Sequence, residues 1–199
     1  MSPESSEPIY FWKPEAEHGY LGQWYHSEFT WERVLEDKSD DVELLKYDNA
    51  EQYMMHRKGL LFAPTDESTA NILARNSPTP HPRLLRSMGR KIPNFDDKVW
   101  AEHRYKIVVE GNYLKFTQNE KLKRRLLGTG DRELVEASPR DRIWGIGFGA
   151  KNAPSQRQRW GKNLLGKALM EVRERIREEE REDREVGADE VDGGDGEGE

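Results

Sequence analysis

The apolar stripe near the C-terminal end of the chain limits the fold most strongly, because it stops at Ile176. Six apolar residues follow helical spacing up to that point: Leu164, Leu165, Ala168, Leu169, Val172 and Ile176. Beyond them charged residues continue through Arg184, and the chain ends in a stretch rich in Gly, Asp and Glu that cannot bury enough apolar surface to order itself. The sequence therefore predicts a folded body over residues 9–176, a disordered lead-in over residues 1–8, and a charged, acidic, disordered tail over residues 177–199. Any helix beyond Ile176 would be a solvated extension.

The negative charge of the chain lies in this tail. Residues 171–199 hold 14 acidic and 5 basic residues, whereas the whole chain has a formal net charge of −6. The rest of the chain is therefore close to neutral, with a slight excess of basic residues. Such a body gives no strong expectation of duplex nucleic-acid binding, which usually needs a concentrated basic face.

Several classes of protein are excluded by what the sequence lacks. The 199 residues include no cysteine, which excludes disulfide scaffolds, thiolate zinc sites and cysteine nucleophiles. The five histidines show no metal-ligand spacing, so we expect no metal site and no cofactor. No apolar run approaches the roughly 20 residues that cross a bilayer, and the polar, acidic start is unlike a secretory leader. We therefore expect a soluble intracellular protein of the cytoplasm, with the nucleus as an alternative.

Local patterns predict several helices and a few short strands. The helix that carries Trp100 is expected to end at the pair Gly111-Asn112. The segments 133–137 and 143–147 are typical of short core strands. Asn163 is expected to cap the last helix, since its side chain can accept a hydrogen bond from an otherwise unpaired amide group.

The first candidate motif is the predicted helical segment that contains Glu51 and Lys58. Seven helical steps of about 100° place these two residues on nearly the same face, roughly 10 Å apart along the axis. A carboxylate and an amine that line one cleft suit acid–base or imine chemistry. The alternative is that both lie on a solvated helix face, where Glu and Lys are common, and the spacing alone favours that alternative.

The second candidate motif runs from Glu136 to Gly147 and contains a polar elbow around Pro139. Pro139 separates two apolar segments, and Ser138 and Asp141 are expected at a strand end, where binding groups are often placed. The glycines after Trp144 permit a close approach of backbone. The alternative, which the composition supports equally, is an ordinary connection in which Asp141 caps a turn and Trp144 belongs to the core.

Two weaker motifs add further candidates. Asn163 follows Trp160 at the expected start of the last helix, where exposed amide groups favour an anion. The spacing matches neither a Walker loop nor a dinucleotide-binding glycine loop, so an ordinary cap is the simpler account. In the other motif, Trp100 can stack on a base and Arg90 can pair with a phosphate. A core tryptophan and a surface cation are the alternative there.

In this order, the motifs resemble the NADAR (NAD and ADP-ribose), or YbiA-like, superfamily. The resemblance extends from about residue 9 to residue 175, and its elbow and Trp160 motifs are specific. It rests on Ala50-Glu51-Gln52-Tyr53-Met54 with Lys58, Gly89-Arg90, Trp100, Gln118-Asn119, Val135-Glu136-Ala137-Ser138-Pro139 with Asp141, Ile143-Trp144-Gly145-Ile146-Gly147 and Trp160-Gly161-Lys162-Asn163. One segment departs, because family members commonly have Leu-Ser-Asn where this chain has Leu21-Gly22-Gln23. That departure bears on the substrate more than on the fold.

The resemblance implies an α+β fold, in which a single, mostly helical domain surrounds a small β-sheet. It also implies an enzyme that splits N-glycosidic bonds. Some members act on phosphoribosylamino intermediates of riboflavin synthesis, and others remove ADP-ribose from modified guanine in nucleic acid. We therefore expect a small ribosyl or ADP-ribosyl substrate, with ADP-ribosylated nucleic acid as a further candidate. A non-catalytic module that binds ADP-ribose or NAD is the alternative.

The resemblance and the motifs together nominate the site. The expected catalytic residues are Glu51, Lys58 and Asp141, and the expected substrate-binding residues are Arg90, Trp100, Asn119, Ser138, Trp144, Gly145, Trp160 and Asn163. In one route, Glu51 or Asp141 stabilises positive charge on the sugar or activates water. In the other, unprotonated Lys58 attacks the anomeric carbon and forms an imine, which requires a lowered pKa of the lysine amine.

Overall fold

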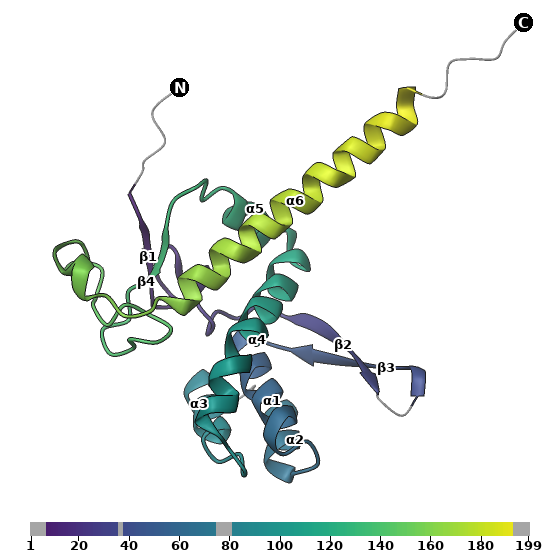
Figure 1. Cartoon of the computed structure of the whole chain (residues 1–199), viewed down its shortest axis with the longest axis vertical. Coiled ribbons are helices and arrows are strands. Elements are labelled where there is room, and N and C mark those ends of the chain that lie inside the picture. Colours follow the sequence, from purple (N-terminus) through teal and green to yellow (C-terminus); the bar gives the residue numbers. More distant parts are fainter. Residues whose placement is uncertain (1–6, 36–37, 75–80, 193–199) are drawn as a thin grey trace, which may run out of the picture.

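The computed structural model describes residues 7–35, 38–74 and 81–192 (Figure 1). In chain order the elements are β1 (Ile9–Phe11), the 3₁₀ helix η1 (Gly19–Leu21), β2 (Phe29–Leu35), β3 (Lys38–Tyr47), α1 (Ala50–Phe62), α2 (Glu67–Leu73), α3 (Pro82–Gly89), α4 (Asp97–Thr117), α5 (Glu120–Leu127), β4 (Leu134–Glu136), the 3₁₀ helix η2 (Pro154–Arg159) and α6 (Leu164–Asp192). Helices predominate and the strands are few, so the expected α+β fold is confirmed.

The strands form two separate two-stranded sheets instead of the single small sheet that was expected. β1 and β4 pair in parallel, with Ile9 opposite Leu134 and Phe11 opposite Glu136. β2 and β3 form an antiparallel hairpin that extends to one side of the helices (Figure 1). The pairing of β1 with β4 places the polar elbow, which follows β4 directly, beside the N-terminal strand.

Helix α4 does not end at Gly111-Asn112, as the sequence predicted, but continues to Thr117. Gly111 lies against α1, where an added Cβ would come within 2.5 Å of Cδ1 of Tyr53. Asn112 is buried and donates hydrogen bonds to the carbonyl oxygen of Val108 and to Oε1 of Gln23. The glycine therefore serves the close approach of α1 and α4. The Nδ2 of Asn112 is paired, whereas its buried Oδ1 has no hydrogen-bond partner among the described residues.

The segment 143–147 is irregular backbone and not the predicted strand. It is nevertheless bound to β4, because the backbone N–H of Ile146 donates to the carbonyl oxygen of Glu136 at 3.0 Å. Gly145 approaches the same carbonyl so closely that an added Cβ would lie 2.7 Å from its oxygen. The glycine thus allows the elbow to fold back onto the end of β4.

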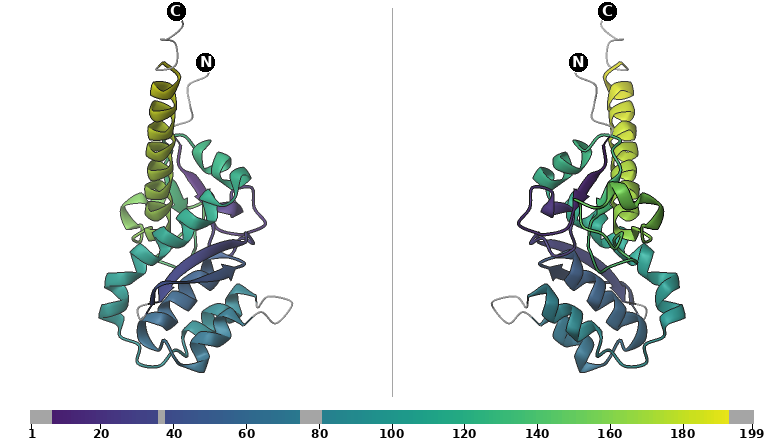
Figure 2. Two further views of the ribbon diagram at one scale, coloured as in Figure 1. Left: turned by 90° about the vertical axis from the view of Figure 1, so that its right-hand side faces the viewer. Right: turned by 90° about the vertical axis from the view of Figure 1, so that its left-hand side faces the viewer.

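Helix α6 begins in the core and ends outside it. Its apolar residues pack on β4, α4 and α5, and Ile176 is the last buried residue in its described part. Within the predicted tail, residues 177–192 continue α6 as a helix, which is the solvated extension that the sequence allowed. Ion pairs such as Arg177–Asp131 support this extension, which stands out from the body as a rod (Figure 2). Residues 193–199 and residues 1–6 of the predicted lead-in lie outside the described residues.

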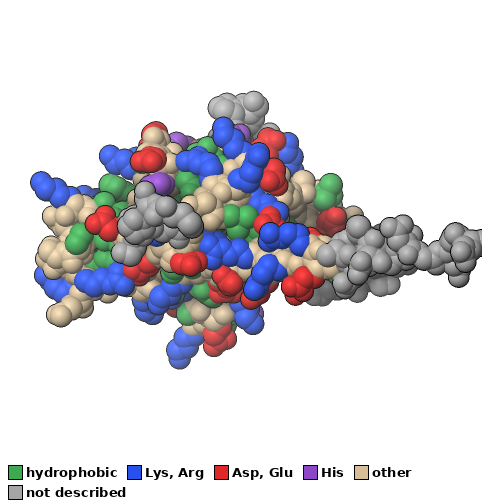
Figure 3. Space-filling view, turned by 90° about the horizontal axis from the view of Figure 1, so that it is seen from above, with side chains coloured by type: hydrophobic (Ala, Val, Ile, Leu, Met, Phe, Trp, Pro, Cys, Tyr) green, Lys and Arg blue, Asp and Glu red, His purple; other side chains and the backbone are tan. Residues whose placement is uncertain are grey.

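The surface carries charges of both signs. On the face seen in Figure 3, Lys and Arg side chains alternate with Asp and Glu side chains instead of forming a field of one sign. Among the helices of the described ranges, none combines the length and the apolar character needed to cross a bilayer.

Candidate active site

Glu51 is the central residue of the candidate site and lies in the first turn of α1. The residue is only 4% exposed, and its backbone N–H donates to the carbonyl oxygen of Gln23. Burial raises the pKa of its carboxyl group to about 7, against the charge of Arg86 and a hydrogen bond from the side chain of Trp24, while the charge of Asp141 raises it further. A carboxyl group that titrates near neutral pH can both accept and release a proton.

Asp141 belongs to the same site and is held by the elbow itself. Its Oδ1 accepts hydrogen bonds from the backbone N–H groups of Ile143, at 2.9 Å, and Trp144, at 2.8 Å. Its Oδ2 lies 3.9 Å from Nη2 of Arg86 on α3. Asp141 therefore caps a turn, as the second interpretation of the elbow predicted, and its charge also acts on Glu51.

Glu136, at the end of β4, is a third carboxyl group in this place, and the sequence motifs predict no role for it. Burial raises its pKa to about 8, the charges of Asp141 and Glu51 raise it further, and the charge of Arg86 opposes them. Its Oε2 is buried and has no hydrogen-bond partner among the described residues. The sequence feature that could have identified Glu136 is its position as the acidic end of the otherwise apolar strand β4, directly before the elbow.

We call Glu51, Glu136 and Asp141 the carboxyl cluster. They come from α1, β4 and the elbow, and Arg86 of α3 is the cation that acts on all three. Within residues 7–35, 38–74 and 81–192, no group of three or more His, Asp or Glu side chains is placed to hold a metal ion, and the carboxyl cluster is no exception.

Lys58 lies apart from the carboxyl cluster, about two turns further along α1. Its Nζ donates to the carbonyl oxygen of Gly89 at 2.7 Å and sits 3.9 Å from the ring centroid of Phe95 and 5.8 Å from that of Trp100. Burial lowers the pKa of the amine, the charge of Asp97 opposes this change, and the charge of Arg90 adds to it. We call Lys58, Phe95 and Trp100 the lysine cage.

The predicted residues of the elbow lie with Asp141. An added Cβ on Gly145 would come within 3.1 Å of Cβ of Ser138, so these two residues are in direct contact range. Trp144 is partly buried and packs on the main core. The structure therefore brings together Glu51, Ser138, Asp141, Trp144 and Gly145, and it places Arg90 and Trp100 with Lys58 at a second location.

Trp160, on the other side of the elbow, belongs to a small second core. Its Nε1 donates to the carbonyl oxygen of Ala153 at 2.8 Å, and its ring meets that of Tyr10 edge-on at 6.2 Å. Its indole N–H is thus engaged by backbone, and the ring packs against protein.

Asn163 and Asn119 bind backbone. Asn163 has a φ of 50° and is not the predicted side-chain cap of the last helix. Its Oδ1 accepts from the backbone N–H of Glu136, and its Nδ2 donates to the carbonyl oxygen of Leu134. Asn119 caps α5 by accepting from the N–H of Leu122. Both side chains position elements of the fold.

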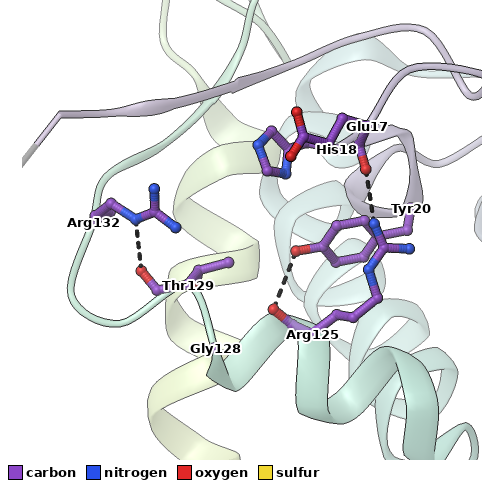
Figure 4. A pocket seen from close by; sticks show the side chains of 7 residues that line it. All are labelled: Glu17, His18, Tyr20, Arg125, Gly128, Thr129 and Arg132. Atoms are coloured by element: carbon purple, nitrogen blue, oxygen red, sulfur yellow. Dashed lines mark hydrogen bonds between the residues drawn. The ribbon is translucent and has the colours of Figure 1, made fainter. Parts of the chain in front are cut away.

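A separate cavity of about 300 Å³ lies between η1 and the turn after α5 (Figure 4). It is lined by Glu17, His18, Tyr20, Arg125, Gly128, Thr129 and Arg132. The guanidinium of Arg125 stacks over the ring of Tyr20 at 3.8 Å and donates to the carbonyl oxygen of Glu17. None of the predicted site residues lines this cavity. The candidate active site is therefore assigned to the carboxyl cluster on the chemistry of its side chains and not on cavity volume.

Comparisons with known proteins agree with this architecture. The solved NMR structure of the E. coli protein YbiA matches with a TM-score of 0.63 and 25% identity, over 89% of each chain. N-glycosidase R617 of Acanthamoeba polyphaga mimivirus is 39% identical over 164 residues, which cover 81% of this chain and 90% of that protein. Riboflavin biosynthesis protein VVA0006 of Vibrio vulnificus is 27% identical over 86% of this chain and 39% of its own length. The NADAR domain model matches residues 10–177, and the chain therefore belongs to the NADAR domain family.

Proposed function

We propose that this protein hydrolyses the N-glycosidic bond between a ribosyl group and a nitrogen atom of its leaving group. Glu51 is the observation that carries the proposal, because it is a buried carboxyl group whose pKa of about 7 fits proton transfer at neutral pH. The names of several relatives, among them the mimivirus and Nostoc punctiforme N-glycosidases, support the same activity. The substrate is a small phosphoribosyl or ADP-ribosyl molecule, including ADP-ribosyl-guanine.

The bond breaks as the sugar carbon gains positive character and the nitrogen departs. Ionised Glu51 accepts a proton from the attacking water, and the negative charge of Asp141 stabilises the sugar carbon. Two backbone N–H groups donate to the carboxylate of Asp141, so the position of its negative charge is fixed before the reaction begins.

The second location binds the rest of the substrate. Lys58 and Arg90 bring positive charge to the end of α1 that lies roughly 10 Å from Glu51 along the helix axis. Phosphoribosyl and ADP-ribosyl groups both carry phosphate, which favours a site with cations. Trp100, in contact range of Lys58, supplies an aromatic face beside that charge.

A second route to the same products uses Lys58 as a nucleophile. Burial lowers the pKa of its amine, and in this route the amine, once it has lost its proton, attacks the anomeric carbon and forms an imine that water then hydrolyses. Borohydride trapping during turnover separates the two routes. A covalent adduct at Lys58 supports the imine, whereas activity that survives Lys58→Ala without any adduct excludes it.

A panel of substrates tests the activity itself. The full chain is incubated with an oligonucleotide that carries ADP-ribosylated guanine, with NAD, and with a phosphoribosylamino intermediate of riboflavin synthesis, and released sugar phosphate or ADP-ribose is measured. Glu51→Gln is expected to lose activity by 100-fold or more on the substrate that is cleaved, the lower end of general acid–base effects.

Glu67→Gln is the matched control, because Glu67 also lies in the first turn of a helix but is exposed. It should retain wild-type turnover. Binding of ADP-ribose or NAD with no cleavage of any substrate would contradict the proposal and identify a binding module.

A further inference from the structure

Glu136 has a buried carboxyl oxygen that no group in the described part of the chain satisfies. Its Oε2 is fully buried without a hydrogen-bond partner in the described part of the chain, although the residue as a whole is partly exposed. Buried polar atoms are nearly always paired, and an unpaired buried negative charge is costly. The surroundings of Oε2 therefore suit either a Glu136 carboxyl group that keeps its proton or a hydrogen-bond donor on the bound substrate.

The charges around Glu136 favour the protonated form. Glu51 faces it from α1, Asp141 from the elbow and Arg86 from α3, so two carboxyl groups act against one guanidinium. Arg86 is exposed, which lets water screen its charge. Of the two buried glutamates, Glu136 holds its proton to the higher pH, about 8 against about 7 for Glu51.

The backbone of Glu136 is fixed on both sides. Its N–H donates to Oδ1 of Asn163 at 3.0 Å, and its carbonyl oxygen accepts from the N–H of Ile146 at 3.0 Å. The parallel pairing with Phe11 adds a third constraint. Because the backbone is held at these three points, the carboxyl group of Glu136 can occupy only a limited region. Proton transfer requires this kind of preorganisation.

We propose that Glu136 is the general acid of this site and hands its proton to the nitrogen atom that leaves the sugar. The role rests on the proposed N-glycosidase activity. As the bond between carbon and nitrogen breaks, the proton of Glu136 moves to the nitrogen, the oxygen of water bonds to the carbon, and Glu51 takes a proton from that water. Afterwards the proton on Glu51 passes to Glu136 and restores both groups. The imine route through Lys58 needs the same protonation of the leaving nitrogen.

The test compares leaving groups. Wild type and Glu136→Gln are assayed on ribosyl substrates whose leaving nitrogens range from weakly to strongly acidic. The kcat of the variant should fall by 100-fold or more for the weakly acidic nitrogens, and the loss should shrink towards a few-fold for nitrogens that depart without a proton. The wild-type rate should also fall as the pH rises above about 8, and Glu136→Gln should lack that fall.

Two further variants control the test. Glu133→Gln removes a carboxyl group three residues earlier, which pairs with Arg157 at the surface, and should behave as wild type. Glu136→Asp keeps a titratable group and should retain the alkaline fall at reduced kcat, so it carries the test if the glutamine variant fails to fold. An equal loss for all leaving groups with an unchanged pH profile would refute the role of Glu136 alone. A wild type that cleaves none of the substrates would refute the proposed function, and this role with it.

Discussion

The negative charge of Glu51 raises the pKa of Glu136, although the two residues lie on different elements, α1 and β4. The order of titration follows from this relationship. Glu51 loses its proton first, near pH 7, and its charge then helps Glu136 to retain a proton until about pH 8. One glutamate is thereby ready to accept a proton while the other is ready to donate one.

This order predicts a narrow optimum in the pH dependence of kcat/KM. Activity should fall below about pH 7, because Glu51 becomes protonated and can no longer act as a base. It should fall again above about pH 8, because Glu136 loses its proton. Initial rates between pH 5.5 and pH 9.5 at constant ionic strength measure the profile. A flat rate across this range would contradict the assignment of both groups.

The same glutamates make the folded protein less stable as the pH rises. Their pKa values are higher in the folded than in the unfolded chain, so the folded state binds more protons between about pH 4.5 and pH 8, and the free energy of unfolding falls across that range. Glu51→Gln should remove about 3 kcal/mol of this pH dependence. Urea denaturation of variant and wild type at pH 5 and pH 8.5 measures it. The variant should gain relative stability at the higher pH, and a constant difference would contradict the prediction.

Lys115 is expected to hold the segment that brings Trp24 to Glu51. Its Nζ is fully buried and donates to the carbonyl oxygens of Tyr20, at 2.7 Å, and Gly22, at 3.0 Å. Lys115→Met leaves both carbonyls unpaired and should lower the free energy of unfolding by about 1–3 kcal/mol near pH 7.

Denaturant titration measures this loss, and Lys106→Met, on an exposed position of the same helix, is the control. Burial lowers the pKa of Lys115 to about 7. The charged form is therefore disfavoured in the folded state, and stability from this residue should increase as the pH rises from about 7. A stability of Lys115→Met equal to that of the control would show that water satisfies the two carbonyls.

Gly111→Ala should destabilise the packing of α1 on α4. An added Cβ would lie 2.5 Å from Cδ1 of Tyr53, whose ring is buried among other aromatic side chains and cannot easily move. Overpacking of this kind costs about 1–3 kcal/mol, which outweighs the roughly 1 kcal/mol by which alanine favours a helix. Thermal and urea denaturation measure the change. Gly149→Ala, where the nearest atom would be 3.8 Å away, should be close to neutral.

The sequence predicted the helical character of the domain and two of the three members of the carboxyl cluster. Glu51 and Asp141 were nominated by a resemblance to a family, and the structure places them within electrostatic reach of each other. Helical spacing alone favoured a solvated face for Glu51 and Lys58, and this was wrong, because both residues are buried. It did not predict that the lysine would turn to the carbonyl oxygen of Gly89, because that contact depends on where α3 packs.

Other features depend on tertiary contacts that local patterns do not contain. A glycine within a helical pattern normally suggests an end, but Gly111 is required by the ring of Tyr53 on another helix. The position of Asn163 directly before a helix predicts a side-chain cap, yet its amide group binds the backbone of β4. Glu136 escaped notice because only the pairing of β1 with β4, and the fold of the elbow, reveal which groups surround its carboxyl group.

The parallel pairing of β1 with β4 also constrains how the protein is made. β4 is held by Asn163, which lies just before α6. Strand β1 therefore cannot pair stably until β4 and Asn163, both in the last third of the chain, have been translated. During synthesis on a ribosome, Glu51 emerges long before Asp141, whose charge raises the pKa of Glu51. A nascent chain therefore cannot acquire activity in stages, and premature termination before α6 should leave fragments that are inert.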